Sequence, residues 1–143
     1  MSISRTVYLR RSALPTPTDW ALAIRTAGFE MDLPTDFEPT EMSGFLPCTY
    51  CGHEAGFEYA FDEASGLELD DELGGSLGER DVAISFVTHA DMRGLVTAVI
   101  AAAVLAATCD GIVHDEESGE VLLASEALTS ARELETEVAA DLD

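Results

Sequence analysis

The sequence predicts an α+β fold in which a mostly antiparallel sheet packs with about three helices, as a single pair of layers around one core. Two observations carry this prediction. Short segments with alternating apolar and polar residues recur along the chain, as in half-buried strands. Segments with helical periodicity lie among them, one of which is almost entirely apolar. At 143 residues, the chain is long enough for a single domain, residues 1–143, with one core.

The N-terminal segment is expected to form a strand and then a helix. Residues 3–10 alternate apolar and polar side chains and predict the strand. Residues 17–27 predict the helix, because Thr16 suits an N-cap and Gly28 is a typical stop. The inner face of this helix is expected to comprise Trp20, Ala23, Ile24 and Ala27.

The middle of the chain is expected to alternate between short strands and polar loops. Residues 29–43 contain prolines and acids, which indicates an irregular surface connection. Two short strands, 44–47 and 56–61, are predicted on either side of the segment CTYCGHEA. The core face of the second strand is expected to carry Phe57, Tyr59 and Phe61. Residues 62–81 hold eight acids and four glycines and predict an exposed acidic loop suited to interaction.

A further strand and a central helix are predicted next. Residues 82–87 alternate as a strand does, and Thr88 with Asp91 resembles a capping box at the start of a helix. The apolar run 95–108 would span about 21 Å as a helix, which is shorter than the roughly 30 Å hydrocarbon core of a bilayer. We therefore expect a buried core helix rather than a membrane span.

The C-terminal part predicts a hairpin and a last helix. Strands 112–114 and 120–123 flank the segment DEESG, whose Gly119 suits the turn. Ser125 is the expected cap of the final helix. Its inward residues are predicted to be Leu128, Ala131, Leu134 and Val138, and its outward ones Glu133, Glu135 and Glu137.

The charge is the most informative feature of the composition. Seven arginines and no lysine face 28 acids, which gives a formal net charge of −21. Residues 1–29 carry four arginines and one acid, so the rest of the chain carries −24. Such a field repels nucleic acid and anionic membranes and attracts a basic partner. A second interpretation stays open, in which the acids only solvate the surface of a protein from a salt-adapted or GC-rich organism.

The termini and cysteines indicate a cytoplasmic protein. No basic region followed by an apolar stretch opens the chain, so no standard export signal is expected. Three cysteines are few and odd in number, which suits a reducing compartment without a disulfide framework.

Most motifs for catalysis and cofactors are missing from the sequence. It contains no HExxH, Walker loop or dinucleotide fingerprint, and the acids around its glycines would repel phosphate. Its one GxSxG match, GGSLG at residues 74–78, falls in the predicted acidic loop and not between a predicted strand and helix, as a nucleophile elbow requires. Carboxylates are so frequent that neighbouring pairs do not identify an acid/base dyad. The sequence therefore predicts a protein that is not an enzyme and has no cofactor.

One spacing allows a metal site. Cys48, Cys51 and His53 could direct two thiolates and an imidazole at a zinc ion, with a fourth ligand from Cys109, His89 or His114. Structural zinc sites usually bring a second close pair of ligands, which this chain lacks. A plain turn between strands is therefore favoured over a zinc site. A thioredoxin-type redox pair is weaker still, because glycines interrupt the helix that it would need.

The order of several segments resembles small immunity proteins of bacterial polymorphic and contact-delivered toxin systems. The resemblance covers about residues 44–135 and rests on GFLP, GFEYAF, RDVAISFVTHADMR with the alanine-rich helix that follows, and GIVHDEESGEVLLASEA. It implies a cytoplasmic, non-catalytic protein that binds a cognate toxin domain and blocks its active site. These families share architecture more than motifs, so no binding residue is carried over from them.

The acids of two loops are the predicted contacts to a basic toxin or effector domain. They are Asp70, Asp71 and Glu72 in the acidic loop and Asp115, Glu116 and Glu117 on the hairpin turn. Such carboxylates could take the place of phosphates against arginine and lysine side chains. The alternatives are an acidic adaptor of another role and a small zinc-binding protein built on the Cys48–Cys51–His53 turn.

Overall fold

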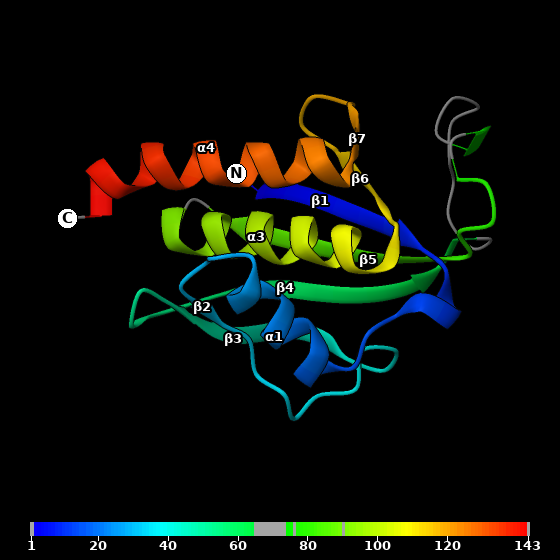
Figure 1. Cartoon of the computed structure of the whole chain (residues 1–143), viewed down its shortest axis with the longest axis horizontal. Helices are drawn as coiled ribbons and strands as arrows, with labels where there is room; N and C mark the ends of the chain where they lie inside the picture. The colour runs from blue at the N-terminus through cyan, green and yellow to red at the C-terminus, as the bar shows by residue number, and fades with distance from the viewer. Residues whose placement is uncertain (1, 65–73, 76, 90, 143) are drawn as a thin grey trace.

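A seven-stranded antiparallel sheet with helices packed on it forms the part of the chain that the computed structural model describes, residues 2–64, 74–75, 77–89 and 91–142 (Figure 1). The strand order is β2-β3-β4-β5-β1-β6-β7. The predicted α+β fold is confirmed. The elements are β1 Ser2–Leu9, the 3-10 turn η1 Arg11–Ala13, α1 Pro17–Thr26, β2 Met31–Asp32, β3 Ser43–Tyr50, β4 His53–Glu63, β5 Val82–His89, α3 Met92–Cys109, β6 Ile112–Asp115, β7 Val121–Leu123 and α4 Ala124–Leu142.

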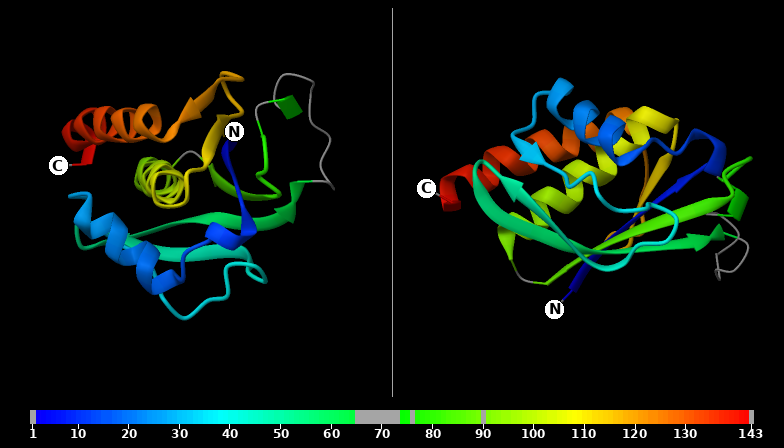
Figure 2. Two further views of the ribbon diagram at one scale, coloured as in Figure 1. Left: turned by 45° about the vertical axis from the view of Figure 1, so that its right-hand side comes forward. Right: turned by 90° about the horizontal axis from the view of Figure 1, so that it is seen from below.

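Helix α3 lies between α1 and α4 and fills the centre of the core (Figures 1 and 2). The indole Nε1 of Trp20 in α1 donates a hydrogen bond of 3.2 Å to the carbonyl oxygen of Ala101. Helix α3 is long and apolar enough to cross a membrane by length and composition, but 72% of it is buried inside the protein. It is thus a core helix, as its small alanine side chains predict.

The β3–β4 hairpin is longer than the sequence predicts. Its turn consists only of Cys51 and Gly52, which both adopt positive φ values of 51° and 80°, as two-residue hairpin turns require. The segment CTYCGHEA is therefore mostly strand, and the prediction of a separate connection is wrong. β4 contains a glycine at position 56, where the backbone lies too close to β3 to leave room for a side chain.

The starts of both later helices also differ from the prediction. Asp91 caps α3, since its side chain accepts a hydrogen bond from the Arg93 backbone, whereas Thr88 belongs to β5. Helix α4 begins at Ala124, so Ser125 is inside it. The Glu126 carboxylate instead reaches back and accepts a hydrogen bond of 3.0 Å from the backbone of Leu123, as the glutamate of a capping box does. Gly28 ends α1 with a φ of 95°, as expected.

The opposite face of the sheet carries a second, smaller cluster. Tyr8, Ala83 and Ile112 are buried there together with Ala64 and Leu77, which belong to the predicted acidic loop, residues 62–81. Since β4 extends to Glu63 and both of these side chains are buried, the prediction that this whole segment is an exposed loop is wrong at its ends. The described ends of this loop therefore pack on the sheet, although residues 65–73 and 76 lie outside the described residues. Elsewhere on this face, β3 and β4 expose side chains that alternate with the buried ones.

Candidate partner-binding surfaces

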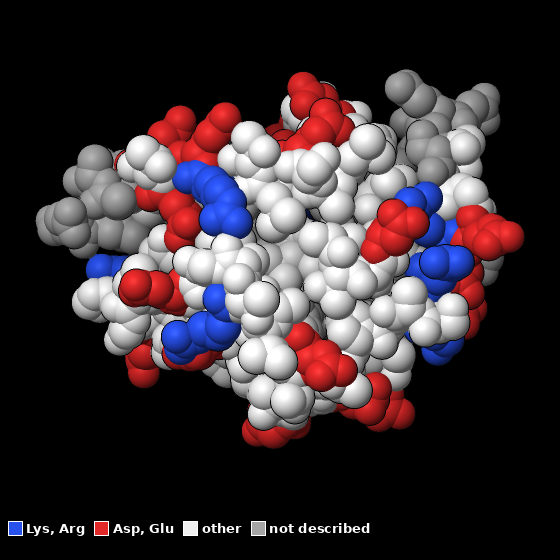
Figure 3. All heavy atoms as spheres, viewed as in Figure 1, with Lys and Arg blue, Asp and Glu red and all other residues white. Residues whose placement is uncertain are grey.

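The positive charges of the protein are largely compensated within it. Four arginines form ion pairs, which are Arg5–Asp115, Arg10–Glu79, Arg11–Glu63 and Arg25–Asp32. Arg80 and Arg132 donate to backbone carbonyls, and the half-buried Arg93 has an Nε without a partner among the described atoms. On the face in Figure 3, the arginines lie beside carboxylates while further acids line the margin. The charge left for a partner is therefore negative.

The predicted contacts of the hairpin turn lie between β6 and β7. Asp115 is half-buried and pairs with Arg5 at 3.4 Å, and its other carboxylate oxygen accepts a 3.0 Å hydrogen bond from the Glu117 backbone. The backbone of Glu116 donates to Ser4 in β1 at 3.2 Å. Asp115 therefore fixes the turn, while the Glu116 and Glu117 side chains remain exposed. The other predicted contacts, Asp70, Asp71 and Glu72, lie outside the described residues.

An acidic cleft of about 280 Å³ opens between this turn and α4. Its apolar lining comes from β1, α3 and α4, and its charged rim from the turn and α4. The lining residues are Ile3, Arg5, Leu95, Val99, Asp115, Glu117, Ser130, Glu133, Leu134 and Glu137.

Helix α4 supplies this rim through its periodicity. Ser130, Glu133, Leu134 and Glu137 are spaced so that they share one face of the helix. Glu133 and Glu137 were predicted only as outward, solvated residues, and the four-residue spacing that places them beside Leu134 is visible in the sequence. Glu135 was expected outward too, but it is half-buried and accepts a 2.8 Å hydrogen bond from the Tyr50 hydroxyl.

The chemistry of the acidic cleft suits a cationic side chain. The carboxylates of Glu117, Glu133 and Glu137 can accept charge-assisted hydrogen bonds from a guanidinium or ammonium group. Its apolar lining suits the methylene stem of arginine or lysine. Two like charges four residues apart on a helix cost a few tenths of a kcal/mol in stability. Glu133 and Glu137 therefore weaken the helix that carries them.

The three possible zinc ligands are not brought together. Cys48 is buried, and burial raises the pKa of its thiol to about 11 although Thr97 is its hydrogen-bond partner. Cys51 and His53 are exposed at the tip of the hairpin. The buried thiol of Cys109 donates to the Leu105 carbonyl oxygen. Across residues 2–64 and the later described segments, no three His, Cys, Asp or Glu side chains form a group that could hold a metal ion.

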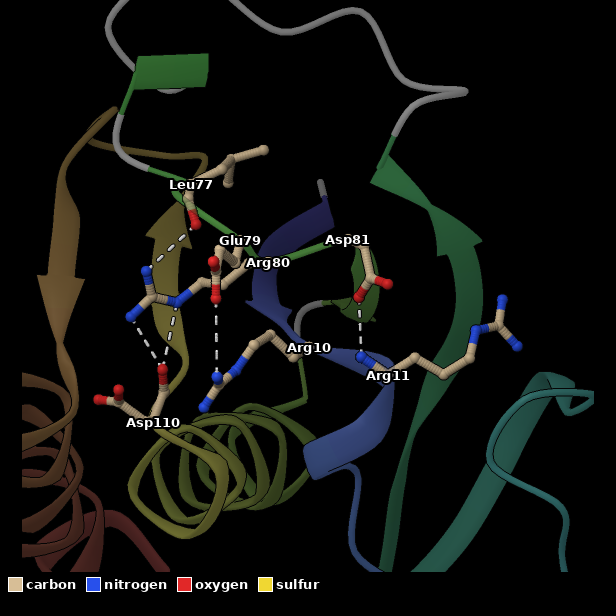
Figure 4. A network of polar contacts seen from close by, with 7 residues as sticks. All are labelled: Arg10, Arg11, Leu77, Glu79, Arg80, Asp81 and Asp110. Carbon is tan, nitrogen blue, oxygen red and sulfur yellow. Dashed lines mark hydrogen bonds and ion pairs between the residues drawn. The ribbon is translucent and has the colours of Figure 1, made fainter.

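A network of arginines holds the far end of the sheet, next to the predicted acidic loop (Figure 4). Arg80 donates from Nε and Nη2 to the Asp110 carbonyl oxygen at 3.1 and 2.8 Å, and from Nη1 to the Leu77 carbonyl oxygen at 3.2 Å. Beside it, the Arg11 backbone donates to Asp81 at 2.8 Å. The bonds to Asp110 fasten the end of the loop to the C-terminus of α3, and the bond from the Arg11 backbone joins Asp81 to η1, so the guanidinium of Arg80 serves the structure.

Comparison with known proteins gives no family for this chain. No protein-family model matches it, and no curated protein is significantly similar to it in sequence. Its function is therefore inferred from the chemistry of its surfaces.

Proposed function

We propose that the protein is a cytoplasmic, non-catalytic immunity protein that neutralises a cognate bacterial toxin by binding and occluding its basic active site. The acidic cleft is the observation that carries the proposal. It combines three exposed carboxylates with an apolar floor on a protein in which four of the seven arginines form ion pairs among the described residues.

The mechanism is substitution for phosphate. A toxin that acts on nucleic acid or nucleotides has to hold phosphate groups with arginine or lysine. Glu133 and Glu137 lie one helical turn apart, with Glu117 facing them across the acidic cleft. They can occupy the same cationic groups and exclude the substrate.

Rigidity of the acidic cleft favours tight binding. Asp115 is fixed by Arg5 and by the Glu117 backbone, and the Gly119 backbone donates to the Asp115 carbonyl oxygen at 2.8 Å. Helix α4 presents the remaining carboxylates from regular secondary structure. Because the backbone that carries these carboxylates is fixed before binding, little backbone entropy is lost when the toxin binds.

Affinity capture followed by a toxicity assay tests the proposal. Tagged protein should retain one basic protein in a stoichiometric amount from a lysate of the native host. That partner should be toxic when expressed alone, and co-expression of the immunity protein should restore growth. A partner that is not toxic would overturn immunity and support the alternative of an acidic adaptor, and the absence of any stoichiometric partner would overturn both.

A pair of matched variants then tests the acidic cleft. Glu117→Gln, Glu133→Gln and Glu137→Gln together should weaken capture and protection. Asp36→Asn, Glu41→Gln and Asp62→Asn remove the same charge from exposed sites elsewhere and should change both much less. Equal effects of the two triple variants would show that general charge, and not the cleft, governs binding.

A further inference from the structure

A second hollow surface lies away from the acidic cleft, over the β3–β4 hairpin. It is a groove of about 640 Å³, here named the hairpin groove. Phe45, Pro47 and Gly56 form its apolar part, while Asp32, Glu54 and Asp91 contribute carboxylates. The hairpin lies in the lower half of Figure 1, with its turn at the left, and comes to the front in the right-hand view of Figure 2.

Phe45 is the most conspicuous side chain of the hairpin groove. It is 60% exposed, while its neighbour Leu46 is 2% exposed and faces the core. A Cβ atom at Gly56 would clash with the Phe45 ring and the Leu46 carbonyl oxygen. The ring therefore rests directly on the backbone of β4, which holds it in place without burying it. An aromatic side chain that is already ordered loses little entropy when a partner covers it.

The rim of the hairpin groove is negative. Asp32 is committed to Arg25 and to the Thr49 hydroxyl, so its charge is compensated. Glu54 and Asp91 are exposed, and no arginine pairs with either of them in the described part of the chain. The groove thus pairs an apolar anchor with the exposed Glu54 carboxylate and with Asp91, of which one oxygen accepts the capping hydrogen bond of α3.

The aromatic ring and the negative rim together indicate which kind of partner fits the hairpin groove. A second copy of the chain would bring two surfaces together that belong to molecules of charge −21, which opposes association. A positively charged segment with an aromatic or large aliphatic side chain matches both parts of the groove, because its cation meets the rim and its apolar group meets Phe45.

We propose that the hairpin groove docks a basic segment of the partner in which an arginine or lysine adjoins an aromatic or aliphatic residue, with Phe45 as the anchor. The proposal rests on the proposed function only for the basic character of the partner. It adds a second contact surface, distinct from the acidic cleft in position and in its aromatic component.

A titration with a defined probe tests this proposal without the partner. Acetyl-arginyl-tryptophanamide is added to the isotope-labelled protein, and backbone amide shifts are followed by NMR. We expect saturable shifts at Phe45, Glu54 and Gly56, with a dissociation constant on the order of millimolar for so small a ligand. Acetyl-glutamyl-tryptophanamide should cause no saturable shift, because the rim repels it.

Two variants and a control complete the experiment. Phe45→Ser should weaken binding of the probe by at least about tenfold, whereas Leu22→Ser, which changes a 63% exposed leucine of α1, should leave it unchanged. Glu54→Arg should also weaken binding, and this exposed site keeps the test valid if Phe45→Ser unfolds the protein.

The outcomes separate this proposal from the proposed function. Shifts confined to the acidic cleft, or binding that neither variant weakens, would overturn docking at the hairpin groove and leave the immunity proposal standing. Saturable shifts at the groove that both Phe45→Ser and Glu54→Arg weaken would support it, whether or not a captured partner proves toxic.

Discussion

The hydroxyl of Tyr50 donates a 2.8 Å hydrogen bond to the Oε2 atom of Glu135 and so joins the β3–β4 hairpin to α4. The two residues are 85 positions apart in the chain. Tyr50 is 7% exposed, and burial together with the nearby Glu135 carboxylate raises the pKa of its hydroxyl. This bond links β3, which carries Phe45, to α4, which carries Glu133 and Glu137. It therefore joins the elements that present the two candidate surfaces.

Removing the Tyr50 hydroxyl should destabilise the protein. In Tyr50→Phe, the half-buried Glu135 carboxylate loses its partner, so the free energy of unfolding should fall by about 1 to 2 kcal/mol. Urea denaturation followed by circular dichroism measures this. Glu133→Gln, on the same helix but without this bond, is the control. Equal stability of Tyr50→Phe and the native protein would mean that the bond contributes nothing.

The sequence predicted the architecture well because the fold rests on periodic patterns. The alternation of β5 and the apolar character of α3 identify their positions directly. β2 was missed, since it has only two residues, Met31–Asp32, and exists because it pairs with Thr49 and Tyr50. Such pairing depends on tertiary contacts that no local pattern contains.

The candidate site was predicted in part. Asp115, Glu116 and Glu117 lie on the turn that borders the acidic cleft, but the contribution of α4 was not anticipated. Charge alone gave no reason to choose Glu133 over Glu135, because both are acids in one helix. The two glutamates differ because the β3–β4 hairpin packs beside Glu135, where Tyr50 donates a hydrogen bond to its carboxylate, whereas Glu133 stays exposed.

The three thiols should differ in reactivity. Cys51 is exposed at the hairpin tip, whereas Cys48 and Cys109 are buried and have pKa values raised to about 11. A disulfide reagent should therefore label one thiol per chain in the native protein at pH 8 and three after denaturation. Cys51→Ser should abolish the native labelling. Labelling of Cys48 at the same rate as Cys51 would contradict the packing of β3.

The raised thiol pKa values predict a loss of stability at alkaline pH. An unfolded thiol titrates near its ordinary value of 9.0, whereas Cys48 and Cys109 titrate near 11 in the folded protein. The unfolded state therefore releases these protons first. The two thiols make their full contribution to the free energy of unfolding below pH 9, and this contribution is lost as the pH rises to 11. The loss amounts to at most about 1.4 kcal/mol per pH unit for each thiol. Above pH 10, the buried Tyr50 and Tyr59 add to the loss, because their pKa values are also raised.

Denaturation curves between pH 8 and pH 11 measure this effect. Cys48→Ala should show a shallower fall than the native protein over that range, although its stability at pH 8 is lower because a buried atom is removed. A free energy of unfolding that stays constant up to pH 11 would show that the thiols are accessible to water.

Neutralising the acids of α4 should stabilise the free protein. Glu133→Gln with Glu137→Gln removes a like-charged pair one helical turn apart and reduces the negative net charge of −21 by two. The free energy of unfolding should rise by roughly 0.5 kcal/mol, as measured by thermal and urea denaturation. Glu116→Gln with Glu120→Gln, which removes the same charge from exposed positions of the hairpin turn, should have a smaller effect. A loss of stability in the α4 variant would show that these glutamates have structural partners.

Association with the partner should depend on salt through its rate. At about 50 mM salt, the charge of −21 attracts a basic protein over a longer distance than at 500 mM, where the Debye length falls to a few ångström. Surface plasmon resonance with the captured partner should therefore show association slowing far more than dissociation accelerates. Neutralising Asp70, Asp71 and Glu72 of the predicted acidic loop together should reduce the association rate without unfolding the protein, since exposed surface charges contribute little to stability. If neither salt nor this triple change alters association, the acids serve solvation alone and binding has to come from apolar contacts such as Phe45.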